Sequence, residues 1–241
     1  MKVMGLIGGM SWESSAEYYR IINEEVKNRL GGLHSAKCLL YSVDFEEIEQ
    51  YQSEGDWEQA GSVLGEAAYS LEKAGADFIV ICTNTMHKVI GNIKGKVSIP
   101  ILHIADATAM EIKKQGIRSV GLLGTKYTME QDFYKSRIEE KGMKVIIPNQ
   151  TEREIVNRII YNELCLGKIN QTSRDSYKKI IHSLVQNGAE GIILGCTEIG
   201  LLVKQEDTQV PLFDTTFIHA VEAVNISLGS YLDAVQENKI Q

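Results

Sequence analysis

The chain of 241 residues contains an internal repeat, which constrains its fold more than any other feature. The segment SLEKAGADFIVICTNT at residues 70–85 matches SLVQNGAEGIILGCTE at residues 183–198. Three shorter matches occur in the same order along the chain. They pair residues 5–8 with 121–124, residues 18–20 with 133–135, and residues 99–103 with 210–214. One such match could arise by chance, but four in one order indicate two copies of a single structural unit.

Each copy is predicted to alternate strands with helices. Continuous apolar runs bounded by turn residues predict strands, whereas apolar residues spaced three or four apart predict helices. The predicted strands are residues 3–8, 37–43, 78–83 and 99–102 in the first copy and residues 120–123, 145–148, 192–196 and 210–213 in the second. The predicted helices are residues 14–30, 57–73, 129–141, 152–166, 173–187 and 216–235. Thr128 and Gln131 have the spacing of a capping box at the start of the third of these helices.

Strands that are apolar along their whole length are typical of parallel sheets covered by helices on both faces. We therefore expect an α/β fold made of two doubly wound parallel-sheet domains. The two domains are expected to be related by a pseudo-twofold axis, with the active site in the cleft between them. The first should comprise residues 1–104 together with a C-terminal helix at about 216–241, and the second residues 105–215.

The composition argues against several classes of function. The chain carries 25 Lys and Arg against 32 Asp and Glu, with no long block of one sign, so we expect no nucleic-acid partner. Its apolar runs are far shorter than the roughly 18 residues that a membrane span requires, and the N-terminus lacks the pattern of a secretory signal. The four cysteines form no C-x-x-C pair. We therefore expect free thiols, no membrane partner and a cytoplasmic protein.

Polar residues follow the apolar strands at four symmetric places. In the first copy they are residues 8–11 and 83–85, and in the second they are residues 124–128 and 196–198. Ligands of open parallel sheets bind at the carboxyl ends of the strands. Small residues there let a ligand approach backbone N–H groups at helix starts, which favour an anion such as a carboxylate. Ordinary turn chemistry explains any one loop equally well, but the symmetric set favours a binding site.

The repeat also sets two neighbouring residues apart. Cys196 aligns with Thr83, whereas Cys82 aligns with Gly195. Because side chains alternate in direction along a strand, Cys82 and Thr83 should point to different sides. We expect Thr83 to face the site and Cys82 to be buried packing, since a buried thiol behaves as a small hydrophobe.

A proton-transferring group on each wall of a cleft suits racemisation next to a carboxylate, because the reaction removes a proton from one face of a carbon and returns one to the other. A thiolate is a fitting base, and preorganised N–H and hydroxyl donors would stabilise the carbanion. We therefore expect Cys196 and Thr83 to be catalytic. The residues expected to contact the substrate from these loops are Met10, Ser11, Asn84, Thr85, Thr125, Thr128 and Thr197.

These residues resemble the aspartate/glutamate racemase family over nearly the whole chain. Family members carry a Cys-Asn-Thr-x-His motif in the first half and a Gly-Cys-Thr motif in the second. The second motif is intact at residues 195–197, whereas residues 83–87 read Thr-Asn-Thr-Met-His, with threonine in place of the first cysteine. The segments Gly-Gly-Met-Ser-Trp at residues 8–12 and Gly-Thr-Lys-Tyr-Thr-Met at residues 124–129 also match. The combination is similar to the branch that has broad specificity or acts on L-aspartate and L-glutamate.

The resemblance implies an amino-acid substrate, no pyridoxal phosphate, no metal and a homodimer. It also implies that aspartate-specific members hold the side-chain carboxylate with an arginine and a lysine. Residues 45–52 contain no basic residue where that arginine is expected, and residues 163–167 contain no lysine. Gln52 is our candidate for a neutral substitute contact. The preferred amino acid and the faster enantiomer therefore stay open.

Two other readings remain. A single-thiol isomerase or decarboxylase acting on dicarboxylates would share the fold, and a two-lobed small-molecule binder would need no thiol at a strand end. His87 either tunes the site or caps a helix, and Lys126 either attracts an anionic substrate or faces water. The residues Glu46, Glu47 and Glu49 are expected to form a solvated helix face rather than paired catalytic carboxylates.

Overall fold

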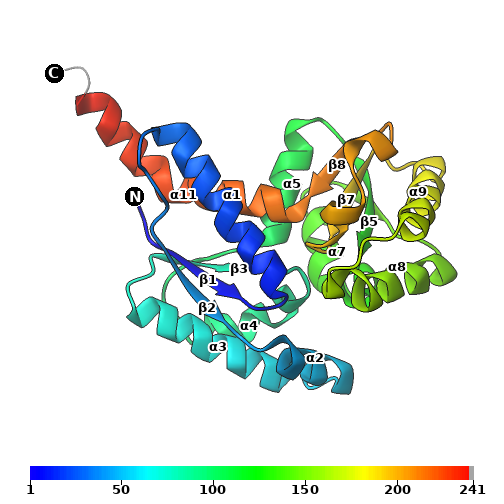
Figure 1. The fold of residues 1–241 in the computed structure, drawn as a ribbon, viewed down its shortest axis with the longest axis horizontal. Helices are drawn as coiled ribbons and strands as arrows, with labels where there is room; N and C mark the ends of the chain where they lie inside the picture. The colour runs from blue at the N-terminus through cyan, green and yellow to red at the C-terminus, as the bar shows by residue number, and fades with distance from the viewer. Residues whose placement is uncertain (239–241) are drawn as a thin grey trace. The chain divides into compact units, whose positions relative to one another are not determined.

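The structure, a computed structural model, describes residues 1–238, with side chains as far as residue 229. The chain forms two compact units (Figure 1). The first contains residues 1–103 and the chain from His219 onward, and the second contains residues 104–218. Each unit is built on one four-stranded sheet in which all strands are parallel.

The first unit follows the predicted alternation of strands and helices and adds three helical segments that were not predicted, at residues 45–54, 85–89 and 90–94. Its elements are β1 (Met4–Gly8), α1 (Trp12–Leu30), β2 (Cys38–Ser42), α2 (Phe45–Glu54), α3 (Trp57–Lys73), β3 (Phe78–Ile81), the 3-10 helix η1 (Thr85–Val89), α4 (Ile90–Lys94) and β4 (Ile101–Leu102). The strand order in the sheet is β2-β1-β3-β4.

The second unit repeats this plan. Its elements are α5 (Ile104–Lys114), β5 (Ser119–Gly124), α6 (Lys126–Glu130), α7 (Asp132–Glu139), β6 (Lys144–Ile146), α8 (Gln150–Asn162), η2 (Leu164–Leu166), α9 (Gln171–Gln186), β7 (Gly191–Gly195), α10 (Ile199–Leu202), η3 (Gln205–Asp207), β8 (Leu212–Asp214) and the start of α11 (Thr215–Asn238). The order β6-β5-β7-β8 is the order of the first sheet, strand for strand. The prediction of two doubly wound α/β units is confirmed.

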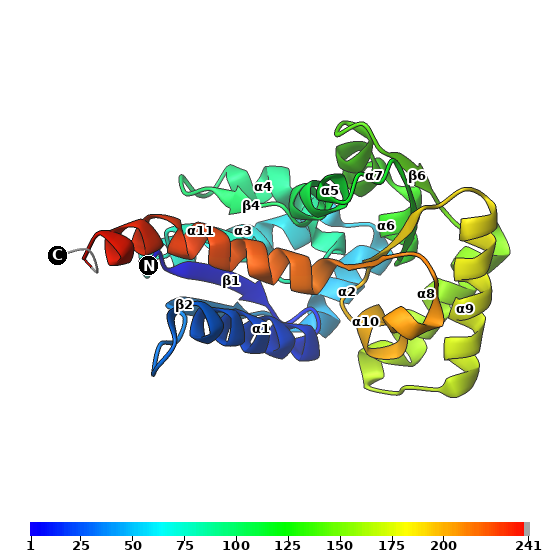
Figure 2. The ribbon, with the colours of Figure 1, turned by 90° about the horizontal axis from the view of Figure 1, so that it is seen from above.

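In the first unit, helices pack on both faces of the sheet. Tyr18 and Ile22 of α1 and Val224 of α11 form one apolar cluster with β1 and β3. Figure 2 shows α1 and α11 side by side over this sheet. Leu64 and Ala68 of α3 form a second cluster on the opposite face. Burial on both faces explains why β1 and β3 are apolar at nearly every position.

The second unit is layered in the same way. Helices α8 and α9 supply Val156, Ile160 and Ile181 to a cluster on one face of the sheet. Helices α5 and α7 cover the other face through side chains that include Ile112 and Tyr134. Each buried side chain of this size contributes about 1.5–3 kcal/mol relative to an exposed one, so these clusters are the main source of stability in each unit.

The helix predicted at residues 129–141 is two short helices, so the expected capping box at Thr128 is wrong. Thr125 is the N-cap of α6, and its hydroxyl accepts a hydrogen bond from the backbone N–H of Thr128 at 3.3 Å. The chain then becomes extended at Gln131, where ψ is 156°, and α7 begins at the next residue. Two amphipathic stretches that the sequence analysis left unassigned, α2 and α5, are also helical.

Among the helices that the structure describes, none is long and apolar enough to cross a membrane.

Candidate active site

In the second unit, the pairing of strands brings the two predicted loops and the loop after β8 to the carboxyl ends of the strands. Gly124 at the end of β5 pairs with Gly195 at the end of β7, and Leu194 pairs with Asp214 at the end of β8. Thr125, Cys196 and Thr215 are the next residues along the chain. The carboxyl edge of this sheet therefore carries the thiol together with hydroxyl groups, as is usual for ligand sites in parallel sheets.

The Cys196 side chain is only 8% exposed and lies against a buried carboxylate. Its Sγ is 3.0 Å from Oε2 of Glu198, to which the thiol donates. The hydroxyl of Thr197 donates to the same oxygen at 2.7 Å. Burial raises the pKa of the Cys196 thiol well above its ordinary value, and electrostatic interaction with Glu198 and Cys165 adds to this rise. The sequence analysis placed Glu198 in the polar loop at residues 196–198 but assigned it no role.

Two further groups occupy the same edge. Thr125 and Thr128 are both buried, and their hydroxyl oxygens lie 3.2 Å apart.

The loop after β8 is held by its own hydrogen bonds. Asp214 accepts backbone N–H groups of Thr216 and Phe217 at 2.9 and 3.2 Å and so caps the start of α11. The hydroxyl of Thr215 donates to the carbonyl of Leu194 at 2.8 Å. These bonds fix the loop after β8 to the strand that leads to Cys196.

In the first unit, the equivalent edge is held by serine hydroxyl groups that the sequence analysis overlooked. Ser15 Oγ accepts the backbone N–H of Gly9 at 2.7 Å and donates to the carbonyl of Ser11 at 2.9 Å. Gly9 has a φ of +93°, and a Cβ there would collide with the backbone of Val43. Ser11, which caps α1, is thereby held in a tight turn next to the sheet.

Thr83 and Cys82 differ in the way that the repeat predicts. Cys82 has no exposed surface and packs in the cluster between β1, β3 and α1, so its expected packing role is confirmed. Burial raises the pKa of its thiol. Thr83, by contrast, is half-buried. Hydrogen bonds hold the backbone before and after this residue. Ser14 donates to the carbonyl of Cys82 at 3.1 Å. The carbonyl of Thr83 itself lies 2.8 Å from Nδ1 of His87.

The other predicted contacts of this unit are buried around η1. Asn84 and Thr85 are 2% and 6% exposed. Gln52, on α2, donates from Nε2 to the sulfur of Met86 at 3.1 Å, so this helix lies against the 83–87 motif. Met10 is also buried and belongs to the apolar cluster beneath α3. The structure thus gives the Met10 side chain a packing role, which leaves the backbone of this loop as the part that could meet a ligand.

Three histidines that are scattered in the sequence gather in the first unit. The rings of His87 and His103 are 4.5 Å apart, and those of His87 and His219 are 5.8 Å apart. His219 Nδ1 lies 2.8 Å from the hydroxyl of Tyr18, and its Nε2 lies 3.1 Å from the carbonyl of Leu102. Burial, together with the smaller effect of the neighbouring His87, lowers the pKa of His219 to about 3. Within the described residues, no group of three or more His, Cys, Asp or Glu side chains is arranged to hold a metal ion.

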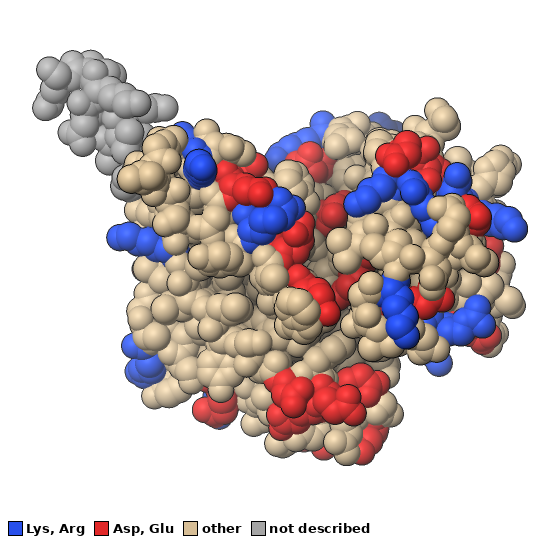
Figure 3. Space-filling model, viewed as in Figure 1, with Lys and Arg blue, Asp and Glu red and all other residues tan. Residues whose placement is uncertain are grey.

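Several charged candidates lie away from these edges. Glu46 and Glu47 are exposed, and Figure 3 shows acidic side chains gathered over α2, which supports the solvated-face interpretation. Lys126 lines a hollow of about 300 Å³ together with Arg153 and Arg158. Arg153 is already paired with Glu130 at 2.8 Å.

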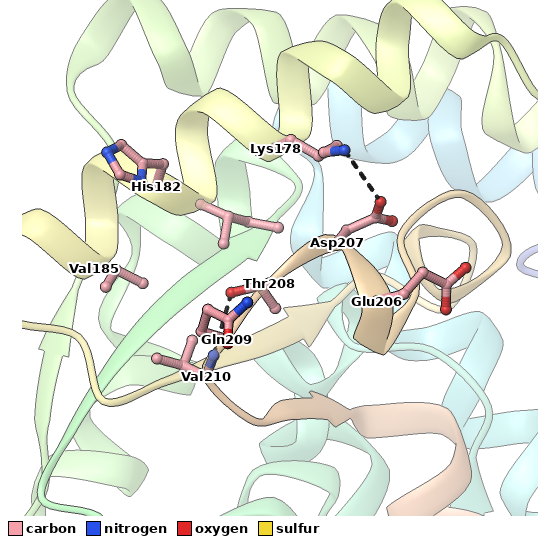
Figure 4. Close-up of a pocket in the computed structure, with 9 residues that line it drawn as sticks. Lys178, His182, Val185, Glu206, Asp207, Thr208, Gln209 and Val210 are labelled. Carbon is pink, nitrogen blue, oxygen red and sulfur yellow. Dashed lines mark hydrogen bonds and ion pairs between the residues drawn. The ribbon is translucent and has the colours of Figure 1, made fainter.

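A second hollow, of about 190 Å³, lies at the opposite edge of the second sheet (Figure 4). It is lined by His182 and Val185 of α9 and by residues 206–210, which precede β8. Its buried carboxylate, Asp207, is engaged by Arg174 at 2.8 Å. The hollow therefore lies at the amino ends of the strands and contains none of the predicted site residues.

The chain is similar to known amino-acid racemases over most of its length. The family model for Asp/Glu/hydantoin racemases matches residues 7–223. The broad specificity amino-acid racemase RacX from Bacillus subtilis (strain 168) is 25% identical over 178 residues, which cover 72% of this chain and 75% of that protein.

Two solved structures share both the fold and a substantial part of the sequence. One, described as a candidate Asp/Glu racemase from Yersinia pestis, is 61% identical with a TM-score of 0.89. The other, an aspartate racemase homologue from Pyrococcus horikoshii OT3, is 39% identical with a TM-score of 0.81. In both cases the match covers 95% of this chain and 100% of the other. This chain belongs to the Asp/Glu/hydantoin racemase family.

Proposed function

We propose that the chain is a cofactor-independent amino-acid racemase of the aspartate/glutamate type. In this proposal Cys196 and Thr83 exchange protons with opposite faces of the substrate α-carbon. The observation that carries the proposal is the matched placement of these two residues. Each lies just beyond the third strand of its unit, in sheets of identical strand order, and each is followed by further polar residues.

The remaining predicted residues supply the electrostatic part of the reaction. Removing the α-proton moves negative charge onto the substrate carboxylate, and fixed hydroxyl and amide donors stabilise that charge. The proposed donors are Ser11, Asn84, Thr85, Thr125, Thr128 and Thr197. Gln52 is proposed to contact the substrate side chain. Because its amide is neutral, binding there should tolerate more than one side chain.

The proposed chemistry needs neither pyridoxal phosphate nor a metal ion, since the protein donors take over the charge stabilisation that such a group would provide. We also propose that the protein is cytoplasmic and forms a homodimer. The resemblance to the racemase family supports both proposals.

Proton NMR in D₂O with a panel of amino acids tests the proposal. The purified protein should replace the α-proton of L-aspartate or L-glutamate with deuterium, and chiral chromatography should show the D-enantiomer appearing. Both rates should be unchanged by EDTA and by added pyridoxal phosphate. The panel should include homoserine and neutral amino acids, because Gln52 replaces a charged contact.

Dicarboxylates without an amino group belong in the same panel. Turnover of maleate or of a substituted malonate, together with inert amino acids, would assign the protein to the isomerase or decarboxylase alternative. Binding without any turnover would favour the two-lobed binding protein.

A further inference from the structure

Glu198 and Cys196 form a direct contact between a buried carboxylate and a buried thiol. The carboxylate is only 4% exposed, and its Oε2 accepts the thiol of Cys196 at 3.0 Å and the hydroxyl of Thr197 at 2.7 Å. Burying a carboxylate is costly unless it is hydrogen-bonded or paired. Two of the donors to this carboxylate are neutral groups, and one of them is the proposed reactive thiol.

The surroundings of the sulfur explain why the thiol needs a partner. Besides Glu198, the titratable groups that face Cys196 are Cys165 of η2 and Tyr177 of α9. None of these groups carries a positive charge, and burial of the sulfur disfavours a thiolate more than any of them does. The backbone N–H of Glu198 acts in the opposite direction and favours the thiolate. A thiol in such a site stays protonated, yet it must lose its proton before it can act as a base.

We infer that Glu198 is the proton acceptor of Cys196, so that the two side chains share one proton and one negative charge. This inference rests on the proposed function of Cys196. Before the reaction the proton is on sulfur and Glu198 is a carboxylate. When Cys196 acts as a base, the S–H proton moves to Oε2, and the thiolate then removes the substrate α-proton. The thiol is restored and Glu198 is left protonated.

Water supplies the second proton that the reaction needs. Water at the Thr83 face gives a proton to the carbanion, which completes the opposite enantiomer and leaves a hydroxide ion. The proton on Glu198 neutralises that hydroxide. The enzyme thus returns to a thiol and a carboxylate, with no net change in protons. In the reverse direction the same transfers run backwards.

Glu198→Gln separates this role from simple support of the loop. The amide has nearly the same shape and can still accept from Thr197, but it cannot take a proton. Losing the negative neighbour should lower the pH at which Cys196 becomes a thiolate by about one unit or more, because a like charge within hydrogen-bond distance shifts a pKa by that order. Alkylation by iodoacetamide across a pH series measures this midpoint. The tryptic peptide of residues 180–204 contains Cys196 as its single cysteine and reports it by mass spectrometry.

The expected result is a more easily ionised thiol in a slower enzyme. In Glu198→Gln the alkylation midpoint should fall, while α-deuterium exchange from aspartate should fall by about 100-fold, as expected when a proton-transfer partner is lost. Glu198→Asp keeps the charge and should hold the midpoint near the wild-type value while recovering part of the exchange. Glu140→Gln removes an exposed carboxylate at the C-cap of α7 in the same unit and should change neither measurement.

Two results would overturn the inference. One is an unchanged alkylation midpoint in Glu198→Gln, and the other is wild-type exchange in that variant despite a shifted midpoint. If the Gln variant fails to fold, Glu198→Asp decides instead: its alkylation midpoint must stay near the wild-type value while part of the exchange is retained, and a midpoint lower by about one unit or more would contradict the inference. Alkylation needs no turnover. A wild-type protein that exchanges no amino acid, together with a lowered midpoint in Glu198→Gln, would therefore disprove the proposed function alone.

Discussion

At the scale of single residues, the two halves of the proposed site use different chemistry. Cys82 lies one residue before Thr83, but it has no exposed surface and its thiol pKa is raised by burial. It therefore cannot replace the thiol that family members carry at the position of Thr83. A threonine hydroxyl is a far weaker acid and base than a thiol, so the Thr83 face has to pass its proton to or from water.

We predict that the two enantiomers of the substrate exchange their α-protons at different rates. The enantiomer that presents its α-proton to Cys196 should react faster, because sulfur takes the proton directly. The equilibrium constant between the free enantiomers stays at one, so kcat and KM must differ together. Deuterium incorporation from each enantiomer, followed separately by proton NMR, measures the difference.

Thr83→Cys should narrow this difference, since it restores a thiol to the second face. Cys82→Ala serves as the matched control and should leave the ratio of the two rates as in the wild type. Equal exchange from both enantiomers of the wild-type protein, with no response to Thr83→Cys, would show that Thr83 has no part in proton transfer.

At the scale of elements, His219 joins three segments of the first unit. It stands on α11, faces Tyr18 on α1, and reaches the carbonyl of Leu102 on β4. Because that carbonyl can only accept, Nε2 carries the proton and the Tyr18 hydroxyl donates to Nδ1. Both ring nitrogens are thus satisfied by the neutral imidazole, which explains why α1 and α11 cover the sheet together.

This arrangement predicts a loss of stability in acid. The pKa of His219 is about 3 in the folded protein, whereas an exposed histidine in the unfolded chain titrates near 6.5. Between these two values the unfolded chain binds the extra proton, so falling pH favours unfolding. From pH 7 to pH 5 this group should cost about 2 kcal/mol of unfolding free energy. Urea unfolding at the two pH values measures the change.

His219→Gln should be less stable at pH 7, because it disturbs two buried hydrogen bonds, but its stability should depend less steeply on pH. His34→Gln removes an exposed histidine of the same unit and should keep the wild-type slope. A His219→Gln slope that equals the wild-type slope would assign the acid sensitivity to other groups.

At the scale of the whole molecule, the repeat was enough to predict the fold class. Each apolar run became a strand of a parallel sheet, and the strand inside the long match ends just before Thr83 in one unit and Cys196 in the other. The signal worked because a strand buried on both faces leaves a continuous apolar run. Helix α2 escaped prediction because its outer face is dominated by glutamates and glutamines, with Ile48 and Gln52 as its buried residues.

The details of the site were less accessible. The Glu198 contact needs the turn after β7 to place residues 196 and 198 side by side, and the histidine cluster joins residues 87, 103 and 219. The first contact depends on the geometry of that turn, and no local sequence pattern encodes the long-range histidine contacts. The serines that hold the first loop, Ser14 and Ser15, are also indistinguishable in sequence from ordinary residues of a helix start.

The most direct test of the account is α-deuterium exchange by Cys196→Ala, measured by proton NMR in D₂O with aspartate and glutamate of both configurations. We predict that exchange falls by at least about 100-fold from both enantiomers, since both directions of the reaction pass through this sulfur. Circular dichroism should show an intact fold, because the change removes one sulfur from a site that is 8% exposed. Near-normal exchange by Cys196→Ala, together with its loss in Cys82→Ala, would contradict the assignment of the reactive thiol.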